Sequence, residues 1–317
     1  MSILITGAGL VGCHFARAAL KRGATVAFFD ASPSEAYIRK IVGEDARVVL
    51  HRGDIRDLPA LIRAVQEARA EVLVHTVSLI GAKVEAQTYT GLTVNLMGAV
   101  HAAEAARLCG VRRLIYISTL GAYDWSRPLT GPVTEEFPLG PGRFYGNSKA
   151  AAELIFQAYH QHYGLDLRIL RLAGVFGRGI YVAGSALGET IHALVTGALQ
   201  KRPVTIPRAP LRQSLYVYAK DVGRAIDLAC TVDEPRHRVM NIATGEVVRP
   251  EEFLGMIARH APGASLAIKE PPEALPPPPA HGLATARAKE ALGFEAEYSV
   301  EQGLADYIRE VREELGR

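Results

Sequence analysis

Residues 2–12 read S-I-L-I-T-G-A-G-L-V-G, and this stretch decides the fold. An apolar, β-branched run leads into Gly7, Gly9 and Gly12, and helical spacing starts at Leu10. The first glycine permits a tight turn, the second lets the backbone approach a pyrophosphate, and the third allows close packing of helix on strand. A glycine triplet alone is typical of a loop, but a strand before it and a helix after it indicate a dinucleotide site. The candidate phosphate-binding residues are Gly7, Gly9, Leu10, Val11 and Gly12.

The second expected strand, 25–29, ends in Asp30, which lies 18 residues beyond Gly12. Near that spacing a carboxylate hydrogen-bonds the adenosine ribose hydroxyls of NAD. No arginine in residues 31–34 is placed to hold a 2′-phosphate, so NAD is favoured over NADP. The alternative is that Asp30 is a solvated turn residue.

Further cofactor contacts are expected after the third and fourth strands, 48–51 and 72–76. Asp54 follows the third strand at a place from which it could reach an adenine amino group. The cofactor-binding residues expected at these strand ends are Asp54, Ile55, Thr76 and Val77.

Strands and helices go on alternating with short connections, which predicts an α/β protein with a doubly wound parallel sheet of the Rossmann type. After a loop at 124–143, a helix from Tyr145 and a sixth strand complete a cofactor-binding domain at 1–173. The remaining strands of this part are expected at 114–117 and 167–172, and its helices at 10–22, 57–69, 92–108 and 145–163.

Beyond residue 173 the pattern becomes less regular and indicates a smaller C-terminal substrate lobe at 174–317. Segments at about 214–243 are expected to return to the Rossmann domain. We expect Asp221 to cap its helix, and the segment 270–282, with its run Pro276–Pro279, to be an extended surface loop. The other elements expected here are a loop at 174–184, helices at 185–199, 221–230, 250–259 and 299–314, and strands at 204–206, 214–218 and 240–243.

Composition excludes several classes of function. The net charge of +3 is too small to indicate nucleic acid or a membrane surface as partner, although a small anion is allowed. No apolar run reaches the length of a membrane span. Cys13, Cys109 and Cys230 are odd in number and lack metal-binding spacing, so we expect free thiols in the cytoplasm and no metal site.

Phe144 to Lys149 reads F-Y-G-N-S-K and places Tyr145 and Lys149 four residues apart, on one face of a helix. An ammonium close to a phenol stabilises the phenolate and lowers its pKa, as a proton-transferring group requires. This spacing also arises by chance on solvated helices. Ser118 and Thr119 end the fifth strand, where open parallel sheets place ligand-facing groups.

Taken together, these motifs resemble the extended short-chain dehydrogenase/reductase family, in its NAD-dependent epimerase/dehydratase group. The resemblance implies that Tyr145 is the general acid/base, that Lys149 holds the nicotinamide ribose and lowers the tyrosine pKa, and that Thr119 hydrogen-bonds the substrate oxygen. Asn95 would bond backbone near the active-site helix. The segments that carry the resemblance are the glycine turn, Asp30, Gly53–Ile55, Asn95, Ser118–Thr119, Tyr145 and Lys149, Arg171–Gly177, Met240–Ala243 and Ala288–Phe294.

The chain departs from the family pattern at three places. Its glycine turn is one residue shorter than the usual T-G-x-x-G-x-x-G. Leu120 and Gly121 follow Thr119, where dehydratases of the family carry Asp-Glu, so dehydration is disfavoured. Gly174 stands where sugar-nucleotide epimerases generally have a diphosphate-binding asparagine, and their later arginine motif matches 212–217 only with an offset.

We therefore expect an NAD-dependent oxidoreductase that transfers hydride at a secondary alcohol or ketone of a sugar- or hydroxy-acid-like small molecule. The alternatives are a sugar-nucleotide 4-epimerase and a non-catalytic dinucleotide sensor. Family analogy suggests a homodimer packed through helices of the cofactor domain. Besides Thr119, the candidate substrate-binding residues are Arg178, Arg208 and Arg212, with Lys83 and Tyr181 as weaker candidates for the pocket lining, and His75 is expected to be a core or cofactor-side residue.

Overall fold

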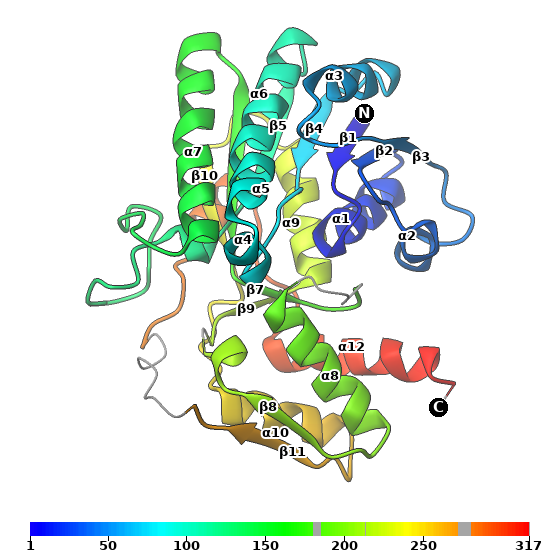
Figure 1. Ribbon diagram of the computed structural model, residues 1–317, viewed down its shortest axis with the longest axis vertical. Coiled ribbons are helices and arrows are strands. Elements are labelled where there is room, and N and C mark those ends of the chain that lie inside the picture. Colours follow the sequence, from blue (N-terminus) through cyan, green and yellow to red (C-terminus); the bar gives the residue numbers. More distant parts are fainter. Residues whose placement is uncertain (180–184, 213, 272–279, 317) are drawn as a thin grey trace.

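The computed structural model describes residues 1–179, 185–212, 214–271 and 280–316. Its main sheet has seven parallel strands in the order β10-β6-β5-β4-β1-β2-β3, which confirms the predicted doubly wound architecture (Figure 1). The strands are β1 (Ser2–Thr6), β2 (Thr25–Asp30), β3 (Val48–Arg52), β4 (Val72–His75), β5 (Arg113–Thr119), β6 (Asp166–Leu172) and β10 (Val239–Ile242).

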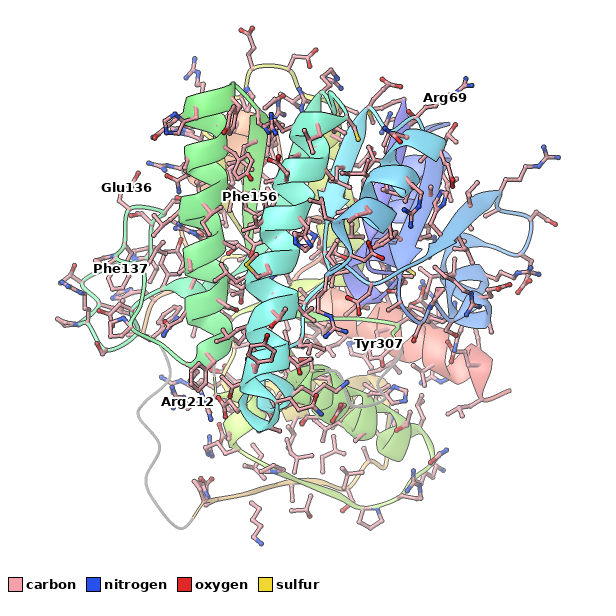
Figure 2. All side chains as sticks on the ribbon, turned by 45° about the horizontal axis from the view of Figure 1, so that its top comes forward. Arg69, Glu136, Phe137, Phe156, Arg212 and Tyr307 are labelled. Carbon is pink, nitrogen blue, oxygen red and sulfur yellow. The ribbon has the colours of Figure 1, made fainter. Side chains whose placement is uncertain are left out.

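Helices cover both faces of the sheet, and each face has its own apolar core. One core includes Phe15 and Ile226 from helices on the first face. The other includes Leu61 and Phe156, of which Phe156 is labelled in Figure 2. Alanines of α6, among them Ala102, are fully buried and let that helix pack close to the strands. The first face carries α1 (Leu10–Lys21), α2 (Glu35–Val42), α9 (Ala219–Thr231) and α11 (Ala286–Leu292), and the second α3 (Leu58–Glu67), α6 (Gly98–Leu108) and α7 (Phe144–Tyr163).

The helix expected at 92–108 is built from several pieces. A π-helical turn, η1 (Thr93–Met97), precedes α6, and two short helices come before it. These are α4 (Ala82–Ala86) and α5 (Thr88–Leu92). A 3-10 turn, η2 (Leu120–Ala122), follows β5 directly. All of these elements lie toward the carboxyl ends of the strands, where the second lobe begins (Figure 1).

The second lobe has a separate core of aromatic and aliphatic side chains, which includes Phe176, Tyr216, Phe253 and Tyr307. Two small parallel sheets, β7 with β9 and β8 with β11, contribute to it. Its elements are β7 (Gly174–Phe176), α8 (Ala186–Leu199), β8 (Val204–Pro207), η3 (Ala209–Leu211), β9 (Tyr216–Tyr218), α10 (Pro250–His260), β11 (Leu266–Lys269) and α12 (Val300–Glu314).

Four details differ from the sequence expectations. The helix α2 and the strand β11 were not expected, and β7 forms within the expected loop at 174–184, because Gly174 pairs with Tyr216. Asp221 does not cap α9, which begins two residues earlier. Its carboxylate instead accepts hydrogen bonds from the backbone of Glu297 and Tyr298, at 2.9 and 3.1 Å. Pro276–Pro279 and most of the expected loop around it lie outside the described residues.

The chain returns to the cofactor domain after β9. Strand β10 pairs with β6 at the edge of the main sheet, and α9 lies beside α1. Two buried arginines fix the end of α9: Arg113 donates to the Cys230 carbonyl at 2.5 Å and Arg168 to that of Ala229 at 3.0 Å. No helix among the described residues has the length and hydropathy needed to cross a membrane.

Candidate active site

The glycine turn between β1 and α1 fits a bound pyrophosphate. Gly9 is the N-cap of α1 and provides no capping side chain, so the first amides of the helix face outward without a side-chain partner. A Cβ at Gly12 would lie 2.1 Å from the Gly7 carbonyl oxygen, which excludes every other residue type there. A Cβ at Gly9 would meet no atom within 4 Å, so open space lies in front of this backbone.

Asp30 lies beside the same turn. Its Oδ2 accepts a hydrogen bond from the Ala8 amide at 2.8 Å, and its Oδ1 accepts one from the Ser32 amide at 2.7 Å. The carboxylate is therefore fixed at the end of β2, with lone pairs left for ribose hydroxyls. It is not a free turn residue.

The other expected cofactor residues surround this turn. Thr76 donates from its hydroxyl to the Thr6 carbonyl at 2.6 Å, and its backbone continues into Val77 against Gly7. Ile55 is buried against α6. Asp54 is engaged by Arg56, whose guanidinium holds the pKa of that carboxyl below its usual range. In this arrangement the Asp54 carboxylate is paired with a side chain of the protein itself.

Thr119, Tyr145 and Lys149 come together at the carboxyl end of β5. The Thr119 hydroxyl lies close enough to the Tyr145 phenol to lower its pKa, and Lys149 lies one turn further along α7. The backbones meet because Gly146 packs on the Gly121 carbonyl of η2. The three residues of the sequence motif therefore lie together, next to the ends of β1 and β4.

Burial sets the pKa values of both Tyr145 and Lys149 in this structure. Burial raises the pKa of Tyr145 to about 12, and the nearby Thr119 hydroxyl lowers it. Lys149 does not act on the phenol here, because its Nζ donates to the Ile117 carbonyl at 2.9 Å and lies 4.8 Å from the centre of the Tyr116 ring. Burial lowers the pKa of Lys149 to about 7, while Glu153 raises it.

Asn95 supports the active-site helix as the sequence predicts. It lies in the π-helical turn η1, where its Oδ1 accepts from the Leu79 amide at 2.8 Å and its Nδ2 donates to the Leu79 carbonyl at 2.9 Å. The same Nδ2 donates to the Ser148 hydroxyl of α7 at 3.2 Å. His75 is buried at the end of β4, with its Nδ1 2.8 Å from the Thr6 hydroxyl, and burial lowers its pKa to about 3.

Comparisons with known proteins place this geometry in a family. The model of the NAD dependent epimerase/dehydratase family matches residues 3–243. The chain belongs to this family. It is 28% identical to a UDP-glucose 4-epimerase of Mycolicibacterium smegmatis, covering 97% of each chain. It is 29% identical to a D-erythronate dehydrogenase of Cupriavidus necator, covering 67% of each.

Solved structures agree with this assignment. The UDP-glucose 4-epimerase of Thermus thermophilus in complex with NAD superposes with a TM-score of 0.82, at 28% identity, covering 98% of this chain and 99% of the other. The chain is an NAD-dependent enzyme of the epimerase/dehydratase family. The uncapped helix, the open space at Gly9 and the fixed Asp30 carboxylate all fit NAD.

The arginines that are candidates for substrate binding differ from one another in their surroundings. Arg178 is ion-paired with Glu314 of α12, and Arg208 with Glu251 and Glu270, so the side chains of both are engaged. Arg212 is half-buried at the end of η3, and its guanidinium has no hydrogen bond or ion pair among the described residues. In Figure 2 it lies near the end of α7 that begins at Phe144. Lys83 is exposed on α4, and Tyr181 lies outside the described part of the chain.

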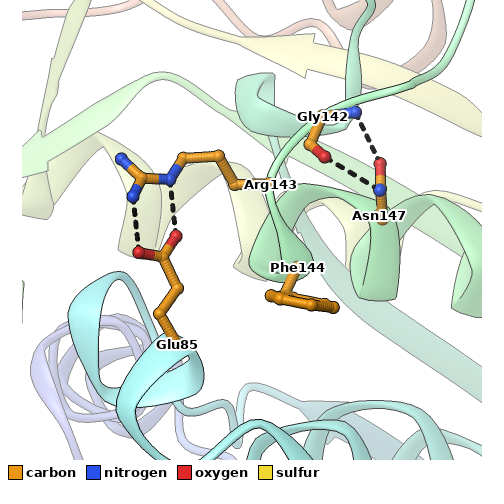
Figure 3. A pocket seen from close by; sticks show the side chains of 5 residues that line it. All are labelled: Glu85, Gly142, Arg143, Phe144 and Asn147. Carbon is orange, nitrogen blue, oxygen red and sulfur yellow. Dashed lines mark hydrogen bonds and ion pairs between the residues drawn. The ribbon is translucent and has the colours of Figure 1, made fainter.

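A surface hollow of about 360 Å³ lies beside the first turn of α7 (Figure 3). Arg143 spans it to Glu85 of α4 through two hydrogen bonds of 2.5 Å. Asn147 holds the backbone of Gly142 from both sides, at 2.8 and 2.9 Å. The exposed ring of Phe144 completes the hollow.

Sequence reasoning missed two residues of this site. A glycine is required at position 146 because its backbone packs directly against η2. The sequence indicates this role only by the position of Gly146 directly after Tyr145. Glu153 is fully buried four residues beyond Lys149, and its partner Arg171 belongs to a segment that had been noted only for its family resemblance. Within the described residues, no group of three or more His, Cys, Asp or Glu side chains is placed to hold a metal ion.

Proposed function

We propose that this NAD-dependent enzyme transfers hydride at a secondary alcohol or ketone of a sugar- or hydroxy-acid-like small molecule. The observation that carries this proposal is the Tyr145 phenol close to the Thr119 hydroxyl, one helical turn from Lys149 and beside the glycine turn. In this proposal NAD supplies the hydride acceptor. The proton chemistry belongs to the protein.

Tyr145 is the proposed general acid/base. In oxidation its phenolate accepts the hydroxyl proton of the substrate, and in reduction its phenol returns a proton to the carbonyl oxygen. Thr119 donates a hydrogen bond to the same substrate oxygen and so fixes it in front of the phenol. Lys149 stabilises the phenolate when its ammonium group turns toward the site. For this turn, Nζ of Lys149 must give up its hydrogen bond to the Ile117 carbonyl.

Gly174 supports a substrate without a nucleoside diphosphate. A Cβ at this position would lie 2.7 Å from Cδ2 of Leu187 and 3.0 Å from the carbonyl oxygen of Leu215. The asparagine generally found there in sugar-nucleotide epimerases would have to displace the Leu187 side chain and crowd the Leu215 carbonyl. The similarity to a D-erythronate dehydrogenase supports a hydroxy acid, and the guanidinium of Arg212 is the proposed partner for its carboxylate.

A sugar-nucleotide 4-epimerase is the second candidate, because two of the relatives named above are UDP-glucose 4-epimerases. The same tyrosine serves both reactions, since epimerisation is an oxidation followed by a reduction on the other face. Reduced nicotinamide then does not accumulate. A non-catalytic sensor is opposed by the assembled Thr119, Tyr145 and Lys149, because a sensor needs no proton-transferring group.

A homodimer packed through the cofactor domain is also proposed. Apart from Val49, the large apolar side chains that are exposed among the described residues gather on α5, η1, α6 and α7. Exposed apolar side chains on neighbouring helices form a face of the kind that is typical of a protein interface. Its members are Tyr89, Met97, Leu108, Phe144, Leu154 and Tyr163.

The free thiols of Cys13, Cys109 and Cys230 support a reducing compartment, for which we propose the cytoplasm.

We propose 1–173 as the NAD-binding domain and 174–317 as mainly the substrate-binding lobe, with about 214–243 returning to the first domain.

The deciding experiment uses purified protein and NAD with aldonates, polyols and hydroxy acids on one side and UDP- and dTDP-sugars on the other. Growth of reduced-nicotinamide absorbance with an acid or polyol supports the dehydrogenase. Conversion of a sugar nucleotide into its epimer without net absorbance supports the second candidate.

A further inference from the structure

Glu153 lies on α7 one turn beyond Lys149, and its side chain is fully buried. Arg171 of β6 holds the carboxylate with three hydrogen bonds, from Nε at 3.1 Å to each oxygen and from Nη2 at 2.6 Å. The hydroxyl of Ser118 donates to the same carboxylate. The carboxylate is thus paired with a guanidinium and has hydrogen-bond donors at both of its oxygens.

The rest of the network leaves Arg171 no freedom to move away. Its Nη1 donates to the Tyr123 phenol at 3.0 Å and to the Glu135 carbonyl at 2.9 Å. Tyr123 in turn donates to Oδ1 of Asn241 at 2.7 Å. The charged pair is thus fixed by β5, β6, β10 and the loop between β5 and α7.

This network touches the active site at two points. Ser118 directly precedes Thr119 on β5, so its hydrogen bond to Glu153 ties the end of that strand to α7. Glu153 also attracts the Lys149 ammonium electrostatically. Among the described residues, the other titratable or charged groups that face Lys149 are His75 of β4, the ring of Tyr116 on β5, Tyr145 on α7 and, beyond Glu153, Arg171.

None of those other groups is a negative charge at neutral pH. Burial keeps His75 neutral, burial raises the pKa of Tyr116 and Tyr145, and Arg171 is a cation. We propose that Glu153 is a positioning residue that keeps Lys149 protonated at working pH and fixes Thr119 against α7. The proposal rests on the proposed function and on the role that the family resemblance implies for Lys149, which is to hold the nicotinamide ribose.

Removal of this negative charge has a direction that can be measured. Without it, Arg171 and Lys149 are two buried cations, so Lys149 releases its proton at a lower pH. Cofactor affinity that depends on the ammonium is then lost at a lower pH as well. A purely structural role of Glu153 would lower stability and leave that pH dependence in place.

The test is NAD binding by calorimetry between about pH 6 and 10, a range chosen to span the titration of Lys149. It uses the cofactor-stripped full chain as wild type, Glu153→Gln, Glu153→Gln with Arg171→Met, and Lys149→Met. Asp306→Asn is the control, because this buried carboxylate of the second lobe is likewise bonded, by Tyr218 and Lys220, and is not part of the Lys149 cluster.

We expect wild-type affinity to fall as pH rises through the titration of Lys149, and the midpoint to move down by roughly one pH unit in Glu153→Gln. The double variant should move less, because both charges are removed, and it carries the test if the single variant does not fold. Asp306→Asn should match wild type. An unmoved midpoint in a folded Glu153 variant overturns the inference alone. Affinity that does not depend on pH, with Lys149→Met binding as wild type, overturns the proposed role of Lys149 and this inference with it.

Discussion

Gly121 and Gly146 touch backbone to backbone, so that a Cβ at position 146 would lie 2.0 Å from the Gly121 carbonyl oxygen. This contact sets the first turn of α7 against η2 and thereby holds Tyr145 beside Thr119. Neither glycine has a role in the chemistry. Because the two backbones approach so closely, the residue directly after Tyr145 has to be a glycine.

Gly146→Ala should therefore uncouple the two groups. The added methyl must push α7 away from η2, and a displacement on the order of 1 Å can lower activity by about 100-fold. Stability should fall by about 1–3 kcal/mol from overpacking. Turnover with the identified substrate and thermal denaturation are the measurements. The matched control is Gly255→Ala in α10, where a Cβ meets only Arg259 at 3.7 Å, and there a gain of roughly 0.5–1 kcal/mol is expected.

The glycine turn offers a test of cofactor binding that separates folding from affinity. Gly9→Ala should leave the stability of the cofactor-free protein unchanged, because a Cβ there meets no atom within 4 Å. Its NAD affinity should fall, since the methyl group enters the space that the pyrophosphate needs. Gly12→Ala should destabilise the fold itself, with its Cβ 2.1 Å from the Gly7 carbonyl. Equal NAD affinity in Gly9→Ala and wild type would contradict the assigned phosphate site.

The lowered pKa of Lys149 predicts that the stability of the cofactor-free protein depends on pH. Its pKa is about 7 in the folded protein, against an ordinary lysine value of 10.5, so the unfolded chain binds more protons between these values. The destabilisation is complete below about pH 7 and disappears as pH rises toward 10. Relative to wild type, Lys149→Met should be more stable at pH 7 by up to roughly 4 kcal/mol. The difference, measured by urea unfolding, should shrink with rising pH, and a constant difference would oppose the assignment.

The buried arginines at the end of α9 predict a large difference between two nearby substitutions. Arg168 is fully buried and donates to the Ala229 carbonyl at 3.0 Å and the Val232 carbonyl at 2.5 Å, so it satisfies the last carbonyls of the helix. Arg168→Met should lower the free energy of unfolding by about 2–4 kcal/mol. Arg112→Met removes an exposed ion pair with Asp233 and should change it by less than about 0.5 kcal/mol. Similar effects of the two substitutions would contradict this account.

Much of the cofactor domain could be predicted, because its signals are local. The first strand has the predicted bounds, and Asn95 makes the expected backbone bonds. The strands β7 and β11 could not be predicted, since each is three or four residues long and pairs with a strand distant in sequence. The helix α2 did carry a local signal, with Ser34 accepting from the Tyr37 amide as its N-cap.

Long-range contacts explain the remaining differences. Asp221 has the sequence position of a helix cap, but backbone amides 76 and 77 residues later take its carboxylate. The direction of the Lys149 side chain depends on the Ile117 carbonyl and the Tyr116 ring, which spacing along one helix does not reveal. The family resemblance identified the residues, whereas their charges followed only from the packing around them.

The central claim is that Tyr145 transfers the proton during hydride transfer with a substrate that carries no nucleotide. It is tested most directly by the initial rate of NAD reduction with the most active hydroxy acid or polyol, compared between wild type and Tyr145→Phe. We predict reduced nicotinamide with wild type, a loss of at least about 100-fold in Tyr145→Phe, and NAD affinity retained in both. Equal rates in the two proteins would contradict the claim, as would turnover of sugar nucleotides alone.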